Sequence, residues 1–108
     1  IKRKLNNSQQ KKTQKVEHIQ GDSVLHYTVL AGKKEDIKKL LHGGIRVSHQ
    51  SSFDGATPLH RAAQVGNVEI ATILINHGAD LNAPNYLGQT SIHVALEKNH
   101  MEFARFLL

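Results

Sequence analysis

The chain has 108 residues, of which 39% are hydrophobic and 5% aromatic, and it carries a formal net charge of +5. This length fits one domain, with a core of small aliphatic side chains. The chain has no cysteine, which excludes disulfides and thiolate metal sites. No apolar run approaches the roughly 18 residues that a membrane-spanning helix needs. We therefore expect an intracellular protein, located in the cytoplasm, the nucleus or both.

Residues 1–20 form a polar, basic segment that holds the whole charge excess. Six lysines and arginines stand there against Glu17, whereas residues 21–108 carry eight basic and eight acidic residues. This composition favours a flexible tail, and a short leading helix with Val16 and Ile19 is the alternative. The segment fits a solvated linker, a nuclear-import signal, or a contact with nucleic acid or lipid. A nucleic-acid-associated or nuclear regulatory factor is therefore the alternative function, although a nucleic-acid-binding fold would spread basic residues over its own surface.

From Gly21 onward, a sequence motif repeats along the chain. Five residues recur after 33 positions, namely Gly55, Thr57, His60, Ala62 and Leu74 as Gly88, Thr90, His93, Ala95 and Leu107. A weaker copy precedes them, from Gly21 through Leu25 and His26 to Gly44. Regular spacing of this kind is the sequence signature of a repeat protein, in which neighbouring units share a continuous core.

Local signals predict two helices in each copy. Ser23, Thr57 and Thr90 are capping residues at matching positions, and Pro58 follows at the first helical position, where its missing N–H costs nothing. Residues 66–67 (Gly-Asn) separate the first helix from the second, which carries apolar residues at spacings of three and four. Gly78 ends that second helix, in the left-handed conformation that glycine adopts without penalty.

The middle copy resembles an ankyrin repeat, whose mark is Thr-Pro-Leu-His-x-Ala, here Thr57 to Ala62. The resemblance implies an all-α solenoid of helix–turn–helix pairs joined by β-turn fingers. It divides the chain into a tail (residues 1–20) and repeats at residues 21–53, 54–86 and 87–108, the last truncated. It also implies a non-catalytic protein–protein interaction module, a scaffold or adaptor of a larger protein. The start at Ile1, without an initiator methionine, likewise leads us to expect a piece of a longer chain.

Neither catalysis nor cofactor binding is predicted. The chain has no glycine-rich phosphate loop, Gly-x-Ser-x-Gly elbow or nucleophile–base pattern. The eight histidines show no metal-site spacing, and the repeats separate His26, His60 and His93 along the stack. The resemblance implies that these three bond to backbone groups of the neighbouring finger. Asp22 and Asp54 lie beside finger glycines and are expected to shape the turns.

The resemblance implies that finger tips and inner helices bind a partner protein or a domain of the same chain. Phe53 and Tyr86 are the expected anchors, because aromatic groups in solvated fingers are typical of binding sites. Packing against their own finger or against the adjacent repeat is the alternative for both residues. The first copy would add Gln20, Asp22, Leu30 and Ala31. The predicted set from the other two copies is Phe53, Ala56, Gln64, Val65, His77, Tyr86, Leu87, Gln89, Glu97 and Lys98.

Two further expectations concern the surface. The second helix of the third copy is apolar throughout residues 101–108, apart from Glu102 and Arg105. A further repeat or a partner molecule is expected to cover it. Leu74 followed by Asp80-Leu81-Asn82 resembles the pattern at which ankyrin asparagines are hydroxylated. Asn82 is therefore a candidate acceptor, with a purely structural hydrogen bond as the alternative.

Overall fold

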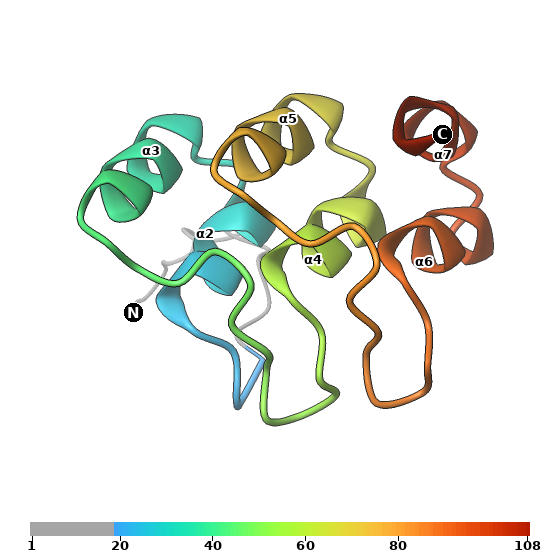
Figure 1. Cartoon of the computed structure of the whole chain (residues 1–108), viewed down its shortest axis with the longest axis horizontal. Helices are drawn as coiled ribbons and strands as arrows, with labels where there is room; N and C mark the ends of the chain where they lie inside the picture. The colour runs from blue at the N-terminus through green and yellow to red at the C-terminus, as the bar shows by residue number, and fades with distance from the viewer. Residues whose placement is uncertain (1–18) are drawn as a thin grey trace, which may run out of the picture.

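The computed structural model describes residues 19–108, which form six α-helices and no β-strand (Figure 1). The predicted all-α fold is confirmed, and one helix pair falls within each predicted repeat, whose exact bounds stay a prediction. Residues 1–18, and with them most of the predicted tail or leading helix (residues 1–20), lie outside the described part. The pairs are α2 (Val24–Ala31) with α3 (Lys34–His42), α4 (Pro58–Val65) with α5 (Val68–Asn76), and α6 (Ser91–Glu97) with α7 (Met101–Leu107).

The first helix of each pair begins at the predicted cap. The Thr57 hydroxyl accepts the His60 backbone N–H, and the His60 ring accepts the Thr57 backbone N–H. Ser23 forms the same capping box with the histidine three residues later. At Thr90, the backbone N–H donates to Nδ1 of His93 at 3.0 Å. A histidine ring therefore accepts the N–H of the capping residue, as the side chain of Glu or Gln does in the common capping box.

The predicted helix ends are also confirmed. Gly66 ends α4 in the left-handed region, with a φ of 75°. Asn67 then caps α5, because its side-chain oxygen accepts the Ile70 N–H at 3.0 Å. Past the end of α5, Gly78 has a φ of 92°. These two left-handed glycines turn the chain between successive helices and towards the next repeat.

The helices lie in two rows, with α2, α4 and α6 in one and α3, α5 and α7 in the other (Figure 1). Within the first row, α4 packs against both α2 and α6. The middle repeat consequently holds the largest share of the core. Its fully buried apolar residues are Leu59, Ala62, Ala63, Ile70, Ala71 and Leu74.

Three loops project from the row of first helices, and we call them finger 1 (residues 19–22), finger 2 (residues 51–56) and finger 3 (residues 85–89) (Figure 1). Backbone bonds join their edges, because Ser52 N–H donates to Gly21 O at 3.1 Å and Tyr86 N–H donates to Asp54 O at 2.9 Å. Gly55 permits a close approach, since a Cβ there would overlap the Tyr86 ring. The fingers therefore form one linked surface.

The second helix of the last repeat, α7, is only partly exposed. The expectation that a further repeat or a partner must cover this whole helix is therefore corrected. Phe103 and Ala104 are buried, because they pack into the shared core. Met101, Phe106 and Leu108 remain exposed. None of the helices within residues 19–108 is long and apolar enough to cross a membrane.

Candidate functional site

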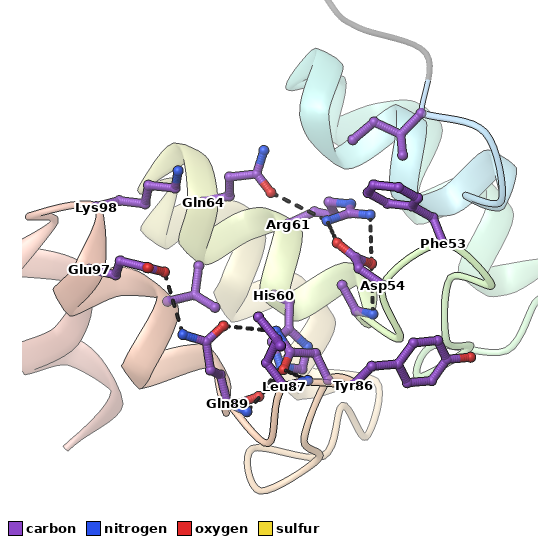
Figure 2. A pocket seen from close by; sticks show the side chains of 14 residues that line it. Phe53, Asp54, His60, Arg61, Gln64, Tyr86, Leu87, Gln89, Glu97 and Lys98 are labelled. Atoms are coloured by element: carbon purple, nitrogen blue, oxygen red, sulfur yellow. Dashed lines mark hydrogen bonds and ion pairs between the residues drawn. The ribbon is translucent and has the colours of Figure 1, made fainter.

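A groove of about 410 Å³ runs between the fingers and the first helices of the second and third repeats (Figure 2). The structure brings eight of the ten predicted binding residues to this groove. They are Phe53, Ala56, Gln64, Tyr86, Leu87, Gln89, Glu97 and Lys98. The predicted residues thus come mainly from fingers 2 and 3 and from the ends of α4 and α6.

The finger side of the groove is apolar. Phe53 is 68% exposed, Tyr86 64% and Leu87 84%. Ile19 also lines the groove, and the sequence prediction missed it. Its signal was nevertheless present, because Ile19, Phe53 and Tyr86 each stand two residues before a finger glycine. One position of the repeat therefore supplies an apolar side chain in three successive fingers.

The helix side of the groove is polar. Gln64 comes from α4, and Glu97 and Lys98 come from the end of α6. Gln89 of finger 3 crosses between the two sides, because its Nε2 donates to Glu97 Oε1 at 3.5 Å and its Oε1 accepts from Asn85 at 3.1 Å. The groove therefore has exposed apolar side chains on its fingers and mostly polar ones on its helices, where Val94 of α6 is the apolar exception.

Other predicted residues lie elsewhere. Ala56 is 2% exposed, so it lines the groove only from below and offers no side-chain contact. Val65 is exposed on α4 but outside the groove lining. His77 follows α5 in the other row and bonds to the Ile73 carbonyl. Among the first-repeat candidates, Asp22 is buried, and none of Gln20, Asp22, Leu30 and Ala31 lines the groove.

A buried arginine supports the groove from beneath. Arg61 and the Asp22 side chain are each 3% exposed, whereas the Asp54 side chain is 35% exposed. Arg61 donates from Nε and Nη2 to Asp22 at 3.0 and 2.7 Å, and from Nη1 and Nη2 to Asp54 at 2.9 and 3.1 Å. A fifth bond runs from Nη1 to Gln64 Oε1 at 3.3 Å. All five N–H donors of the guanidinium are therefore used.

The roles of the two aspartates were only partly predicted. Asp54 does shape its turn, because its Oδ1 accepts the Ala56 N–H at 3.0 Å. Both carboxylates also bind Arg61, which lies 39 residues from Asp22 in the sequence. Burial alone would raise the pKa of Asp54, but the hydrogen bonds from Arg61 and Ala56 hold it below its usual range. Burial would likewise lower the pKa of Arg61, and the two carboxylates raise it instead. The cluster therefore keeps one negative charge in excess.

Two histidines of the capping boxes join consecutive repeats, and His100 Nε2 also bonds across repeats, to Gln64 O at 3.1 Å. His26 Nε2 bonds to Ala56 O at 2.7 Å, and His60 Nε2 bonds to Gln89 O at 2.8 Å. Because Nδ1 of each ring accepts a backbone N–H, Nε2 must carry the proton and donate. Burial lowers the pKa of both histidines. The predicted structural role of His26 and His60 is confirmed.

His93 occupies the same repeat position but is exposed, and its Nε2 has no hydrogen bond within residues 19–108. No group of three or more His, Cys, Asp or Glu residues in this range is arranged to hold a metal ion. His18 lies outside it. Within the described part, the rings of His26, His60 and His93 take part in capping boxes, and those of His26, His60 and His100 bond across repeats.

Asn82, the predicted hydroxylation site, is exposed ahead of finger 3. Its backbone N–H donates to Asp80 Oδ1 at 2.9 Å. Its side-chain amide has no hydrogen bond to any described residue. The Asn82 side chain is therefore accessible, while its backbone is held in a turn.

Comparison with known families agrees with this architecture. A family model described as Ankyrin repeats (3 copies) matches residues 25–108. This range includes all six helices apart from the first residue of α2.

Several curated proteins are similar to the chain over most of its length. It is 30% identical over 118 residues to the NF-kappa-B inhibitor cactus of Drosophila melanogaster, a match that covers 82% of the chain and 24% of that protein. It is 37% identical over 78 residues to the probable E3 ubiquitin-protein ligase XBOS33 of Oryza sativa subsp. japonica, with coverages of 71% and 15%. It is 36% identical over 84 residues to the ARF GTPase-activating protein GIT1 of Homo sapiens, with coverages of 78% and 11%. The chain thus spans about a quarter or less of these relatives.

Proposed function

Because the chain belongs to the ankyrin-repeat family, whose repeats are protein-interaction modules, we propose that it binds a partner protein through the groove, without catalysis. The partner is a separate molecule or another domain of the same protein. Two relatives carry enzyme names, but the chain spans only 15% and 11% of them. The predicted intracellular location stays a prediction.

The observation that carries this proposal is the row of exposed apolar side chains on the fingers. Phe53 and Tyr86 stand at equivalent positions of fingers 2 and 3 and both line the groove. In Figure 2 the Phe53 ring points toward Arg61, and the Tyr86 ring points away from Glu97 and Lys98. Exposed aromatic groups cost solvation unless a partner covers them, and aromatic residues supply much of the energy at protein interfaces. The alternative is that the rings pack against their own finger or the adjacent repeat, and the Tyr86 ring does lie close to Gly55 of finger 2. Phe53 nevertheless remains 68% exposed and Tyr86 64% exposed, which supports the proposal.

Nothing in the described part favours the nucleic-acid alternative. That prediction rests on the basic residues of the tail, which lie outside residues 19–108. The described part carries as many acidic as basic residues. We therefore do not propose nucleic acid as the partner.

The groove can be tested with short random peptides displayed on phage and selected on the purified chain. Enriched peptides are then synthesised and their affinities measured by fluorescence anisotropy. Replacing Phe53 and Tyr86 together by alanine should weaken binding by about tenfold or more, because the contact area between the two rings and the peptide is removed. Phe106→Ala, which removes a ring 43% exposed on α7, is the matched control and should leave the affinity unchanged.

Circular dichroism of the double variant decides how a loss of binding is interpreted. A native helical spectrum with lost affinity supports the groove. Unaltered affinity, or an equal loss in Phe106→Ala, contradicts the proposal. A loss of the helical spectrum would mean that the rings belong to the fold, as the alternative states.

We also propose that a further repeat or a partner covers the exposed side of the third repeat. His93 Nε2 stands where His26 and His60 donate to the next finger. Leu96 is 48% exposed, whereas its counterpart Ala63 is fully buried. Extending the chain by a consensus ankyrin repeat should raise the melting temperature cooperatively. Two separate melting transitions would argue against this proposal.

Hydroxylation of Asn82 is a further proposal, supported by the accessible side chain described above. Mass spectrometry of the peptide that contains Asn82, isolated from cells, should show one added oxygen. Finding only the unmodified peptide would leave the turn as the sole role of Asn82.

A further inference from the structure

We propose that the groove recognises a basic residue, lysine or arginine, of the partner protein. The apolar stem of that residue lies between Phe53 and Tyr86, and its cationic head reaches the Asp54 carboxylate. This inference rests on the proposed function of the groove and adds the chemistry that selects the partner.

The first argument is the unbalanced charge beneath the groove. Arg61 is paired with two carboxylates, so the cluster retains one negative charge. The Asp22 side chain is buried, at 3% exposed, whereas the Asp54 side chain is 35% exposed. The excess charge is therefore accessible only at Asp54. A partly dehydrated carboxylate of this kind interacts more strongly with a cation than a fully solvated one does.

The second argument is the free hydrogen-bonding capacity of this carboxylate. Asp54 Oδ1 accepts from Ala56 N–H and Arg61, and Oδ2 accepts only from Arg61. A carboxylate offers about four acceptor positions, so one remains open at Oδ2. An ammonium or guanidinium of the partner can donate to it.

The third argument is the position of the two aromatic rings. Phe53 precedes Asp54 in the chain, and Tyr86 is held beside it by the bond from Tyr86 N–H to Asp54 O. In the view of Figure 2 the Asp54 carboxylate points toward Arg61, with the Phe53 ring above it and the Tyr86 ring below it. Aromatic faces attract cations, and they also cover the aliphatic stems of lysine and arginine. The three side chains thus suit both parts of a basic residue.

The same groove disfavours an anionic ligand. Arg61 has no unused N–H donor, because Asp22, Asp54 and Gln64 take all five. The other cation lining the groove, Lys98, stands next to Glu97. An acidic partner would therefore meet Asp54 without a compensating charge at the floor of the groove.

The test uses the phage-selected peptides on the full chain. We expect the enriched peptides to share a lysine or arginine flanked by apolar residues. Replacing that residue by glutamine in the synthetic peptide should lower the affinity about tenfold, and Asp54→Asn in the protein should do the same. When both changes are combined, the losses should not add, because they remove one interaction. Asp36→Asn, which neutralises an exposed carboxylate on α3, is the matched control and should have no effect.

Lys98→Gln keeps the inference testable if Asp54→Asn disturbs the fold. The side-chain ammonium of Lys98 makes no hydrogen bond to the described residues. Its removal should tighten binding of the basic peptides about twofold to threefold at low salt. Enrichment of apolar or acidic peptides that still require Phe53 and Tyr86 would overturn this inference but retain the groove. Peptides unaffected by the loss of both rings would overturn the groove itself.

Discussion

The second and third repeats start with the same capping box but place its histidine in different surroundings. His60 is 2% exposed and bonds through Nε2 to finger 3, whereas His93 is exposed and keeps only the bonds to Thr90. The cap is therefore a local property of each repeat. Burial of the ring and its second hydrogen bond are supplied by the following repeat.

The same comparison holds for the residue after the histidine. The second repeat has Arg61 there, buried with two carboxylates, whereas the third has Val94, buried at 8% exposed. The same position of the repeat is thus occupied by an arginine that joins two fingers in the second repeat and by an ordinary apolar core residue in the third. Four predictions test this difference between the second and third repeats. The largest expected effect is that of replacing the arginine.

Replacing Arg61 by valine, the residue of the third repeat, should lower the free energy of unfolding by about 3–5 kcal/mol. The reason is that Asp22 would remain buried without its cation. Urea denaturation followed by circular dichroism measures the loss. Adding Asp22→Asn to this variant should recover part of it, and a loss below about 1 kcal/mol would show that the cluster contributes little.

The two histidines should differ in the cost of their removal. His60→Ala leaves the Gln89 carbonyl and the Thr57 N–H without partners, so we expect a loss of about 2–3 kcal/mol. His93→Ala breaks only the cap and should cost about 1 kcal/mol. Denaturant titrations of both variants give the two losses in the free energy of unfolding. The difference between them measures the contribution of the hydrogen bond from His60 Nε2 to the next repeat. Equal losses would contradict the assignment of that joint to Nε2.

Acid should weaken the joints between repeats. Because the pKa of His26 and of His60 is lowered in the folded state, the unfolded chain binds protons first as the pH falls below about 6.5. The contribution of the two neutral histidines to the free energy of unfolding is therefore complete above that pH. It declines as the pH falls further, until the histidines of the folded state are also protonated. Melting temperatures between pH 7 and pH 5 check the slope. His60→Gln should make it shallower, and an unchanged slope would exclude His60 as a contributor.

The smallest expected effect is a gain. Ser91 occupies the position of Pro58, and its buried hydroxyl has no hydrogen-bond partner among the described residues. Ser91→Pro should raise the free energy of unfolding by about 0.5–1 kcal/mol, because proline restricts the unfolded chain. Ser91→Ala separates the effect of the lost hydroxyl from that of the ring. A destabilised proline variant would mean that this helix start differs from its counterpart.

Features encoded within one repeat could be predicted from the sequence. The caps at Ser23, Thr57 and Thr90 depend on residues three positions apart, and the chain reversal at Gly66 depends on one residue's conformational freedom. Eight of the ten residues that the resemblance named line the groove, because position in a repeat determines which side a residue faces. Their contact with a partner stays a prediction.

Features that depend on contacts between repeats could not be predicted. Asp22 and Arg61 lie far apart in the chain, so their pairing becomes visible only when the fingers are stacked. Ala56 was expected to face a partner, but its neighbours bury it and use its carbonyl. The whole second helix of the third repeat was expected to need a cover from outside, whereas its Phe103 packs into the shared core.

The acceptors of the histidine joints are main-chain carbonyls, at Ala56 and Gln89. Main-chain carbonyls are present whatever the side chain, so a joint of this kind places little demand on the identity of the finger residue. Mutations at finger positions can accordingly alter ligand preference while repeats continue to assemble in register. Selection acting on recognition and selection acting on folding are thereby largely separated, which makes the fingers a suitable place to engineer new specificity.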